Sequence, residues 1–176
     1  MRRHALVLLC CAVIGVARVA EACELFRGDE NLLPGELLGK TWTKTKLPDK
    51  GDVNAALAQL DEQDIPAVRK IDLNGDGRPE LLMTSSDGRL CGNAGCPYQL
   101  LAPQSFKRIG EFFGHLAILD ERVNGYRIIQ SFSRYLSSLT RLDTYVFDGK
   151  AYRLVAHAIV DQCGLEQWSR RLRKPD

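Results

Sequence analysis

A chain of 176 residues, 45% of them hydrophobic, is long enough to bury the core of one domain. Its formal net charge is only +2, and removing a predicted signal over residues 1–22 reduces 24 basic residues to 21 and 22 acidic residues to 21. A neutral mature chain excludes the strongly basic class of proteins that bind nucleic acids or anionic membranes through charge.

The first 22 residues have the pattern of a cleaved secretory signal. Two arginines precede an apolar run over residues 5–17, and Ala20 and Ala22 form a small–x–small cleavage site. The run of about 13 residues is shorter than the ~20 that cross a bilayer, and no later segment is long and uncharged enough to do so. We therefore expect export to the periplasm or the cell exterior. Lipid attachment at Cys23 is the alternative, although Glu21 stands where a lipidation motif has a small or apolar residue.

One mature domain over residues 23–176 is expected, because no repeat or low-complexity linker divides it. Its parts are an irregular segment, a helix, a β-rich core and a tail, at residues 23–51, 52–65, 66–160 and 161–176. The helix is predicted because four apolar side chains share one face at helical spacing, namely Val53, Ala56, Leu57 and Leu60. Asp52 is expected to cap this helix, and Pro66 to stop it.

After Pro66 the hydrophobic period becomes that of strands. Eight strands are predicted, at residues 67–71, 80–85, 97–102, 105–109, 115–121, 126–132, 139–147 and 152–159. Three dipeptides suit tight hairpins between them: Asp87 with Gly88, Asn124 with Gly125, and Asp148 with Gly149. The expected fold class is therefore α+β and mainly β: an antiparallel β-meander sheet with one short amphipathic helix, stapled by disulfides.

The segment DLNGDGRPE, between the first two predicted strands, places oxygen-bearing side chains at alternate positions. Asp72, Asn74 and Asp76 stand at positions one, three and five, and Glu80 stands at nine. Ca²⁺ takes six to eight oxygen ligands, and a loop curled around it also offers a backbone carbonyl at position seven, here that of Arg78. The sequence thus predicts a structural calcium site. The alternative is a plain turn, and an EF-hand is excluded because position twelve is Met83.

The same segment resembles the strand–loop–strand calcium loop of FG-GAP and VCBS-type repeats of secreted and surface proteins, whose pattern is DxNxDGxxE. The resemblance covers about 15 residues, and this chain has one such loop where those families have several. More widely, the helix, this loop, CGNAGC and FDGKAYRL are similar to small exported bacterial proteins of unknown function, over residues 52–154. This resemblance implies a role in the cell envelope and makes Asp72, Asn74, Asp76 and Glu80 the calcium candidates.

Four cysteines remain after removal of the signal: Cys23, Cys91, Cys96 and Cys163. An even number in an oxidising compartment favours two disulfides, and the preferred pairs are Cys91 with Cys96 across a glycine-rich loop and Cys23 with Cys163. A zinc site is the alternative, but no CxxC pair supports it.

The chain lacks the motifs of the common enzyme mechanisms, since it has no GxSxG, no HExxH and no phosphate loop. We therefore expect a binding protein rather than an enzyme, with a protein or a glycan as partner. Candidate contacts lie in the polar segment SFSRYLSSLTR, at Arg134, Tyr135 and Arg141, because loops on a rigid scaffold often carry recognition. The alternative is a secreted hydrolase that uses Glu80 with Asp143 or Asp148.

Overall fold

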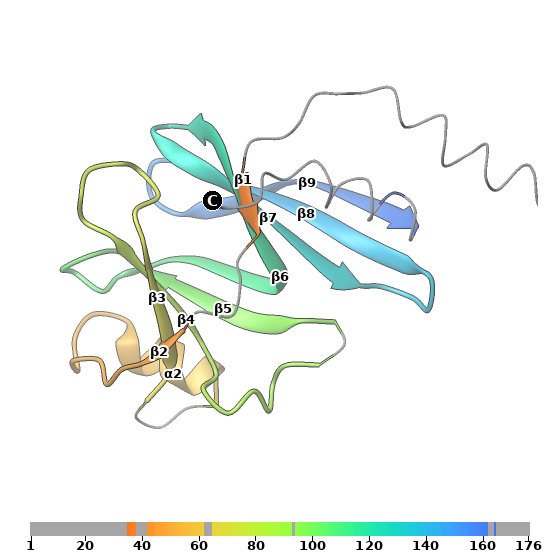
Figure 1. Cartoon of the computed structure of the whole chain (residues 1–176). Helices are drawn as coiled ribbons and strands as arrows, with labels where there is room; N and C mark the ends of the chain where they lie inside the picture. The colour runs from red at the N-terminus through yellow and green to blue at the C-terminus, as the bar shows by residue number, and fades with distance from the viewer. Residues whose placement is uncertain (1–34, 38–41, 62–64, 93, 162–163, 165–176) are drawn as a thin grey trace, which may run out of the picture.

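The computed structural model describes residues 35–37, 42–61, 65–92, 94–161 and 164. In these residues the chain forms an antiparallel meander in the order β2-β3-β4-β5-β6-β7-β8-β9, and β1 pairs separately with β6 (Figure 1). The elements are β1 (Gly35–Leu37), β2 (Thr43–Lys44), α2 (Val53–Gln59), β3 (Ala67–Ile71), β4 (Glu80–Thr84), β5 (Cys96–Leu101), β6 (Arg108–Val123), β7 (Tyr126–Arg134), β8 (Leu139–Phe147) and β9 (Tyr152–Asp161). The predicted fold class, mainly β with one short helix and a disulfide, is confirmed.

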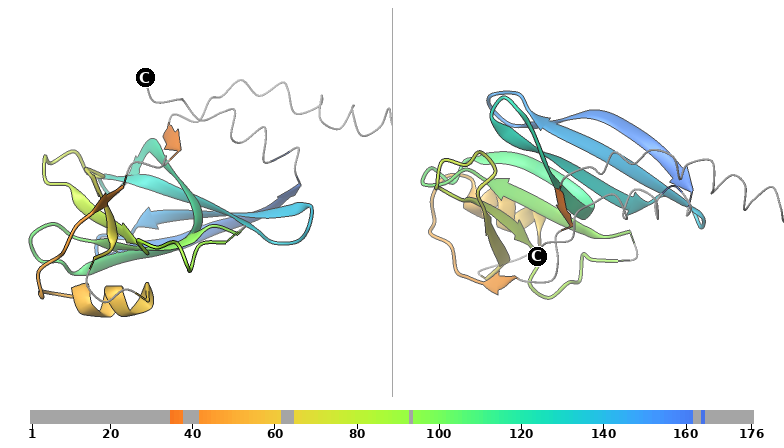
Figure 2. Two further views of the ribbon diagram at one scale, coloured as in Figure 1. Left: turned by 60° about the horizontal axis from the view of Figure 1, so that its bottom comes forward. Right: turned by 45° about the horizontal axis from the view of Figure 1, so that its top comes forward.

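The helix uses the apolar face that its spacing predicts. Val53, Ala56, Leu57 and Leu60 are buried, and they pack on Val68, Leu81, Met83 and Leu101 of the sheet. Figures 1 and 2 show α2 at the β2–β5 end of the molecule. The described helix is shorter than expected, since it ends at Gln59 and Asp61 has a left-handed φ of 50°.

The expected cap is wrong in one respect. Asp52 occupies the N-cap position, but its side chain makes no cap hydrogen bond. Its Oδ2 instead accepts a hydrogen bond of 2.7 Å from the backbone N–H of Arg108, at the start of β6. The carboxylate thus ties the helix to the sheet, because a donor brought close by the tertiary fold competes with the helix N–H groups.

The two strands expected at residues 105–109 and 115–121 are one strand of 16 residues, β6. Its first half pairs with β5 as far as Gly114, and its second half pairs with β7 from His115 onward. Gly114 has φ 121°, and a Cβ there would lie 2.5 Å from the carbonyl oxygen of Phe132. A glycine that resembles a strand break in the sequence therefore lets one long strand serve both halves of the sheet.

The hairpin dipeptides have different outcomes. Asn124 and Gly125, with φ of 52° and 83°, form the two-residue turn between β6 and β7 as predicted. Asp148 begins the turn between β8 and β9 and accepts hydrogen bonds from two backbone N–H groups of that turn. Asp87 and Gly88 lie within the longer connection from β4 to β5, so the tight hairpin expected there is wrong. The segment expected to be irregular contains the short strands β1 and β2, which lack a hydrophobic period that would reveal them.

Aromatic rings from β6 to β9 fill the main core. The rings of Phe112, Tyr126, Tyr145, Phe147 and Tyr152 contact one another with centroid separations of 4.0 to 6.3 Å. These contacts hold the β6–β7 hairpin firmly against β8 and β9, and that hairpin is the platform on which the 72–80 segment rests. No helix in the described ranges is both long and apolar enough to cross a membrane.

Candidate metal centre

The DLNGDGRPE segment connects the antiparallel strands β3 and β4, so its ends are held together by the pairing of Ile71 with Glu80. Gly75 and Gly77, with φ of 78° and 79°, supply the left-handed backbone that turns the chain. We call residues 72–79 the β3–β4 loop.

Side-chain oxygens of the β3–β4 loop point inward to its own backbone. Asp72 accepts hydrogen bonds from the N–H groups of Gly75, at 2.7 Å, and Gly77, at 2.9 Å. Asn74 Oδ1 accepts from the N–H of Asp76 at 2.9 Å, and Asp76 Oδ1 accepts from the N–H of Arg78 at 2.7 Å. The bond from Gly77, with those from the other loop amides, lowers the pKa of Asp72 below its ordinary value, so this carboxyl stays charged.

Glu80, the first residue of β4, lies buried beneath the β3–β4 loop. The residue has no exposed surface, and its Oε2 accepts a hydrogen bond of 2.9 Å from the N–H of Leu73. Its Oε1 is buried and makes no hydrogen bond within 3.5 Å to the described residues, although the hydroxyl of Tyr126 lies close enough for the Glu80 carboxyl to add to burial in raising the pKa of that tyrosine. Burial raises the pKa of Glu80, and the negative charges of Asp72 and Asp76 raise it further. A buried carboxylate oxygen without a partner is costly, because such a group loses its water and gains nothing in return.

The β6–β7 hairpin forms the other side of the loop. Arg122 Nη1 donates to the carbonyl oxygen of Leu73 at 2.9 Å, and the N–H of Arg127 donates to the same oxygen at 2.8 Å. Asn74 Nδ2 donates to the hydroxyl of Tyr126 at 3.1 Å. Sequence reasoning missed these contacts, because they join positions about 50 residues apart and no spacing in the chain indicates them.

Four of the predicted ligand residues lie in the β3–β4 loop and Glu80 is the first residue of β4, but the five do not converge on one point. In the described part of the chain, no three Asp, Glu, His or Cys side chains are gathered closely enough to hold a metal ion. The loop oxygens bond to loop amides, and Asn74 Nδ2 donates to Asp76 Oδ2 at 3.0 Å. Asp76 is exposed, Asp72 and Asn74 are half-buried, and Glu80 is held in place by the core.

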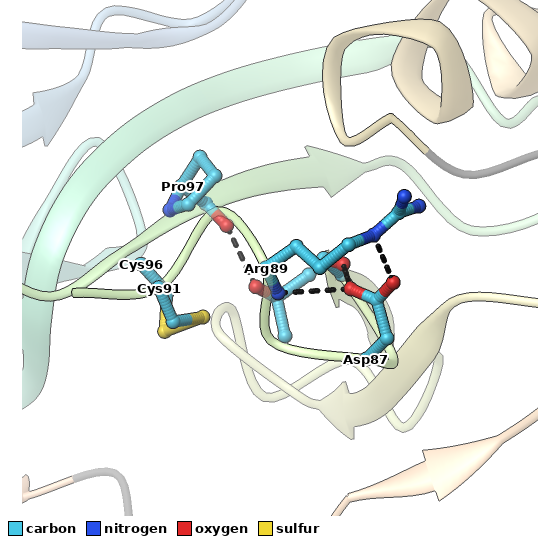
Figure 3. Close-up of a disulfide and its surroundings, with 7 residues drawn as sticks. Asp87, Arg89, Cys91, Cys96 and Pro97 are labelled. Atoms are coloured by element: carbon cyan, nitrogen blue, oxygen red, sulfur yellow. Dashed lines mark hydrogen bonds and ion pairs between the residues drawn. A yellow bond between two sulfur atoms is a disulfide. The ribbon is translucent and has the colours of Figure 1, made fainter.

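The Cys91–Cys96 disulfide lies in the connection from β4 to β5 (Figure 3). Gly92 and Gly95 exchange backbone hydrogen bonds inside it, at 3.0 and 2.9 Å. Nearby, Arg89 pairs with Asp87. The predicted pairing is present; the other expected pair, Cys23 with Cys163, lies outside the described residues.

The three candidate contact residues differ in their surroundings. Arg141 Nε is 2.7 Å from Oδ1 of the buried Asp143, and Arg134 Nη2 donates to the carbonyl oxygen of Ser137 at 3.2 Å. Tyr135 is 57% exposed at the connection between β7 and β8, beside the equally exposed Leu136. Arg134 and Tyr135 are exposed, whereas Arg141 is half-buried.

The carboxylates considered for hydrolysis are engaged with neighbours. Asp143 faces Arg141, and Asp148 accepts from the N–H groups of Lys150 and Ala151 and pairs with Arg153. The bond from Ala151, followed by that from Lys150, lowers the pKa of Asp148 to about 2. Both carboxylates thus have structural partners, and Glu80 lies under the β3–β4 loop.

Comparison of the chain with models of protein families, with curated proteins and with solved structures gave no match.

Proposed function

We propose that this protein is an exported binding protein whose β3–β4 loop takes up a structural Ca²⁺. The observation that carries the proposal is the buried carboxylate of Glu80, whose Oε1 lacks a hydrogen-bond partner in the described residues, directly below a loop that bears Asp72, Asn74 and Asp76. A hard cation at this place would give the buried oxygen the partner that it lacks. Asp72, Asn74, Asp76 and Glu80 would hold the ion with the carbonyl of Arg78, and water would complete the six to eight oxygens.

Calcium at this place would act on the fold rather than on a substrate. The loop joins β3 to β4 and is bonded to the β6–β7 hairpin through Leu73 and Asn74, so an ion there would stiffen the contact between the two halves of the sheet. With the affinity of extracellular calcium modules, ~10⁻⁴ to 10⁻³ M, about 1 mM calcium would add ~0.4 to 1.4 kcal/mol to the free energy of unfolding.

Two features support export. Residues 1–22 carry the signal pattern, and the Cys91–Cys96 disulfide is a bond that persists in oxidising compartments. The mass of the mature N-terminus tests this part: cleavage before Cys23 predicts a chain that begins there, and a diacylglycerol on that residue would indicate the lipid-anchored alternative. The partner, a protein or a glycan, would reach the exposed Tyr135 and its neighbourhood.

Calorimetric titration of the oxidised protein with CaCl₂ tests the calcium proposal. We expect heat of binding and a raised Tm, both abolished in an Asp72→Ala, Asp76→Ala double variant. Glu121→Gln, at an exposed position of β6, removes one negative charge outside the loop and is the control for a nonspecific effect of lost charge. Absence of binding at several millimolar calcium would reduce the loop to a plain turn.

A further inference from the structure

A pocket with a volume of about 650 Å³ opens at the β2–β4 edge of the sheet. Its apolar lining comes from the sheet and from three flanking connections, namely β2–α2, β3–β4 and β5–β6: Leu47, Val68, Pro79, Leu81, Pro103 and Phe106. Sites for small molecules are concave, mostly apolar and ~300–1,000 Å³ in volume. The pocket therefore has the size and composition of a small-molecule site.

The pocket lies beside the apolar cluster that α2 covers. Val68 and Leu81 belong to the same apolar cluster that α2 covers, and Leu47 and Phe106 pack against that cluster. A helix of seven residues is only about 10 Å long, so it cannot cover the whole face of β2, β3 and β4. The uncovered part of this face is the floor of the pocket.

Lys70 brings positive charge to the floor of the pocket. Lys70 is exposed, it alternates with Val68 along β3, and it pairs in register with Leu81, so all three side chains lie on one face. Arg69 lies between Val68 and Lys70 on β3, so its side chain points to the opposite face, and the described lining contains no acidic residue. An apolar cavity with one lysine at its floor and no carboxylate favours a ligand that carries negative charge at one end.

One wall of the pocket is held in a strained conformation. Phe106 has a left-handed φ of 55°, and Gln104, which also lines the pocket, has a φ of 63°. Such backbone is unfavourable for a bulky residue, and it persists here because the N–H of Phe106 donates to Ala102 at 3.1 Å and its carbonyl accepts from Asp52 at 3.0 Å. Residues held in this way are frequent in ligand clamps.

We infer that this pocket binds a small amphipathic carboxylate. The apolar body of the ligand lies on Val68 and Leu81 against the ring of Phe106, and its carboxylate lies at the ammonium of Lys70. This inference goes beyond the calcium proposal and does not rest on it, because none of the five proposed ligand residues lines the pocket.

The probe is 4-phenylbutyrate, titrated into the ¹⁵N-labelled, oxidised protein by NMR in EDTA and again in calcium. We expect shifts of the backbone amides of Thr43, Val68 and Lys70 that saturate with a Kd of about 1 mM or tighter, a limit set by the ligand's size. The neutral isostere 4-phenylbutanol should bind several-fold more weakly, because it lacks the charge that Lys70 attracts.

Two variants and one control locate the site. Thr45→Phe, at an exposed lining residue, fills the pocket and should abolish binding, while Lys70→Gln should weaken it about threefold to tenfold. Lys150→Gln, at the exposed turn between β8 and β9, should leave the Kd unchanged. The dispersion of each variant's NMR spectrum checks that it folds.

Absence of saturable shifts, equal affinity for the alcohol, or indifference to both pocket variants would overturn the inference. Binding only of a peptide through its C-terminal carboxylate, without the free acid, would overturn it as well. Calcium titration is read separately, so failure of the pocket and failure of the calcium loop are distinguishable.

Discussion

Glu80→Gln should raise the free energy of unfolding relative to the parent protein when calcium is absent, and calcium should reduce or remove that advantage. Glu80 has no exposed surface, and of its two oxygens only Oε2 has a hydrogen-bond partner within the described residues. The carboxylate also lies near the charges of Asp72 and Asp76, which disfavour its ionised form. Glutamine has nearly the same shape, keeps an oxygen for the N–H of Leu73 and removes the charge.

In EDTA at neutral pH, the variant should be more stable than the parent by about 1 kcal/mol. The effective penalty for an unpaired buried ion is several kcal/mol, and the unpartnered amide that replaces it costs about 1 to 3 kcal/mol. In 1 mM calcium the parent should gain ~0.4 to 1.4 kcal/mol and the variant should gain nothing, so the advantage of the variant shrinks or disappears.

Guanidinium unfolding followed by tryptophan fluorescence, in EDTA and in 1 mM CaCl₂, measures both differences. Glu121→Gln is the matched control, because it makes the same chemical change at an exposed position, and it should alter neither value by more than about 0.5 kcal/mol. A Glu80→Gln protein that loses more than about 1 kcal/mol in EDTA would refute the reasoning, because the charge would then be favourable in the calcium-free fold.

Three further outcomes are expected from other parts of the sheet. Gly114→Ala should destabilise the protein by more than Gly149→Ala in chemical unfolding, since both have positive φ but only a Cβ at Gly114 would meet a neighbouring strand, at 2.5 Å; equal losses would contradict the crowding argument. Asp148→Asn should lower the Tm at neutral pH but not near pH 2. Folding lowers the pKa of this carboxyl from ~3.9 to about 2, so its charged form stabilises the folded protein fully above pH ~3.9, and this contribution is lost as the pH falls through 2. Replacing Cys91 and Cys96 by serine should cost about 2 kcal/mol in urea unfolding, the value for a loop of this length, and an unchanged midpoint would show that the bridge does not constrain the unfolded chain.

Local patterns predicted those features that depend on neighbouring residues. The burial of Val53, Ala56, Leu57 and Leu60 follows from helical spacing, and the strands β3 and β8 have the predicted bounds. The turn at Asn124 and Gly125 follows from the positive φ that these residue types tolerate. The disulfide between Cys91 and Cys96 was predictable because the two cysteines are only five positions apart, so a local loop brings them together.

Features that depend on distant residues were not predictable from the chain alone. Two strands were expected at residues 105–109 and 115–121, and only the close approach of β7 at Gly114 shows how β6 continues between them. Asp52 reads as a cap, and only the position of Arg108 shows that it ties the helix to β6.

In the candidate site, too, local features could be predicted from the sequence and long-range contacts could not. The amino-acid sequence by itself determined the alternating oxygens of Asp72, Asn74 and Asp76 and the turn that carries them, because a loop's own residues set its local geometry. The tertiary structure alone decided that Glu80 is buried beneath that loop, and that Arg122 of β6 and Tyr126 of β7 contact the loop. It also decided that a pocket with Lys70 at its floor opens beside β3. Burial, charge environment and cavities arise from segments that meet only after folding, and no local pattern encodes which segments those are.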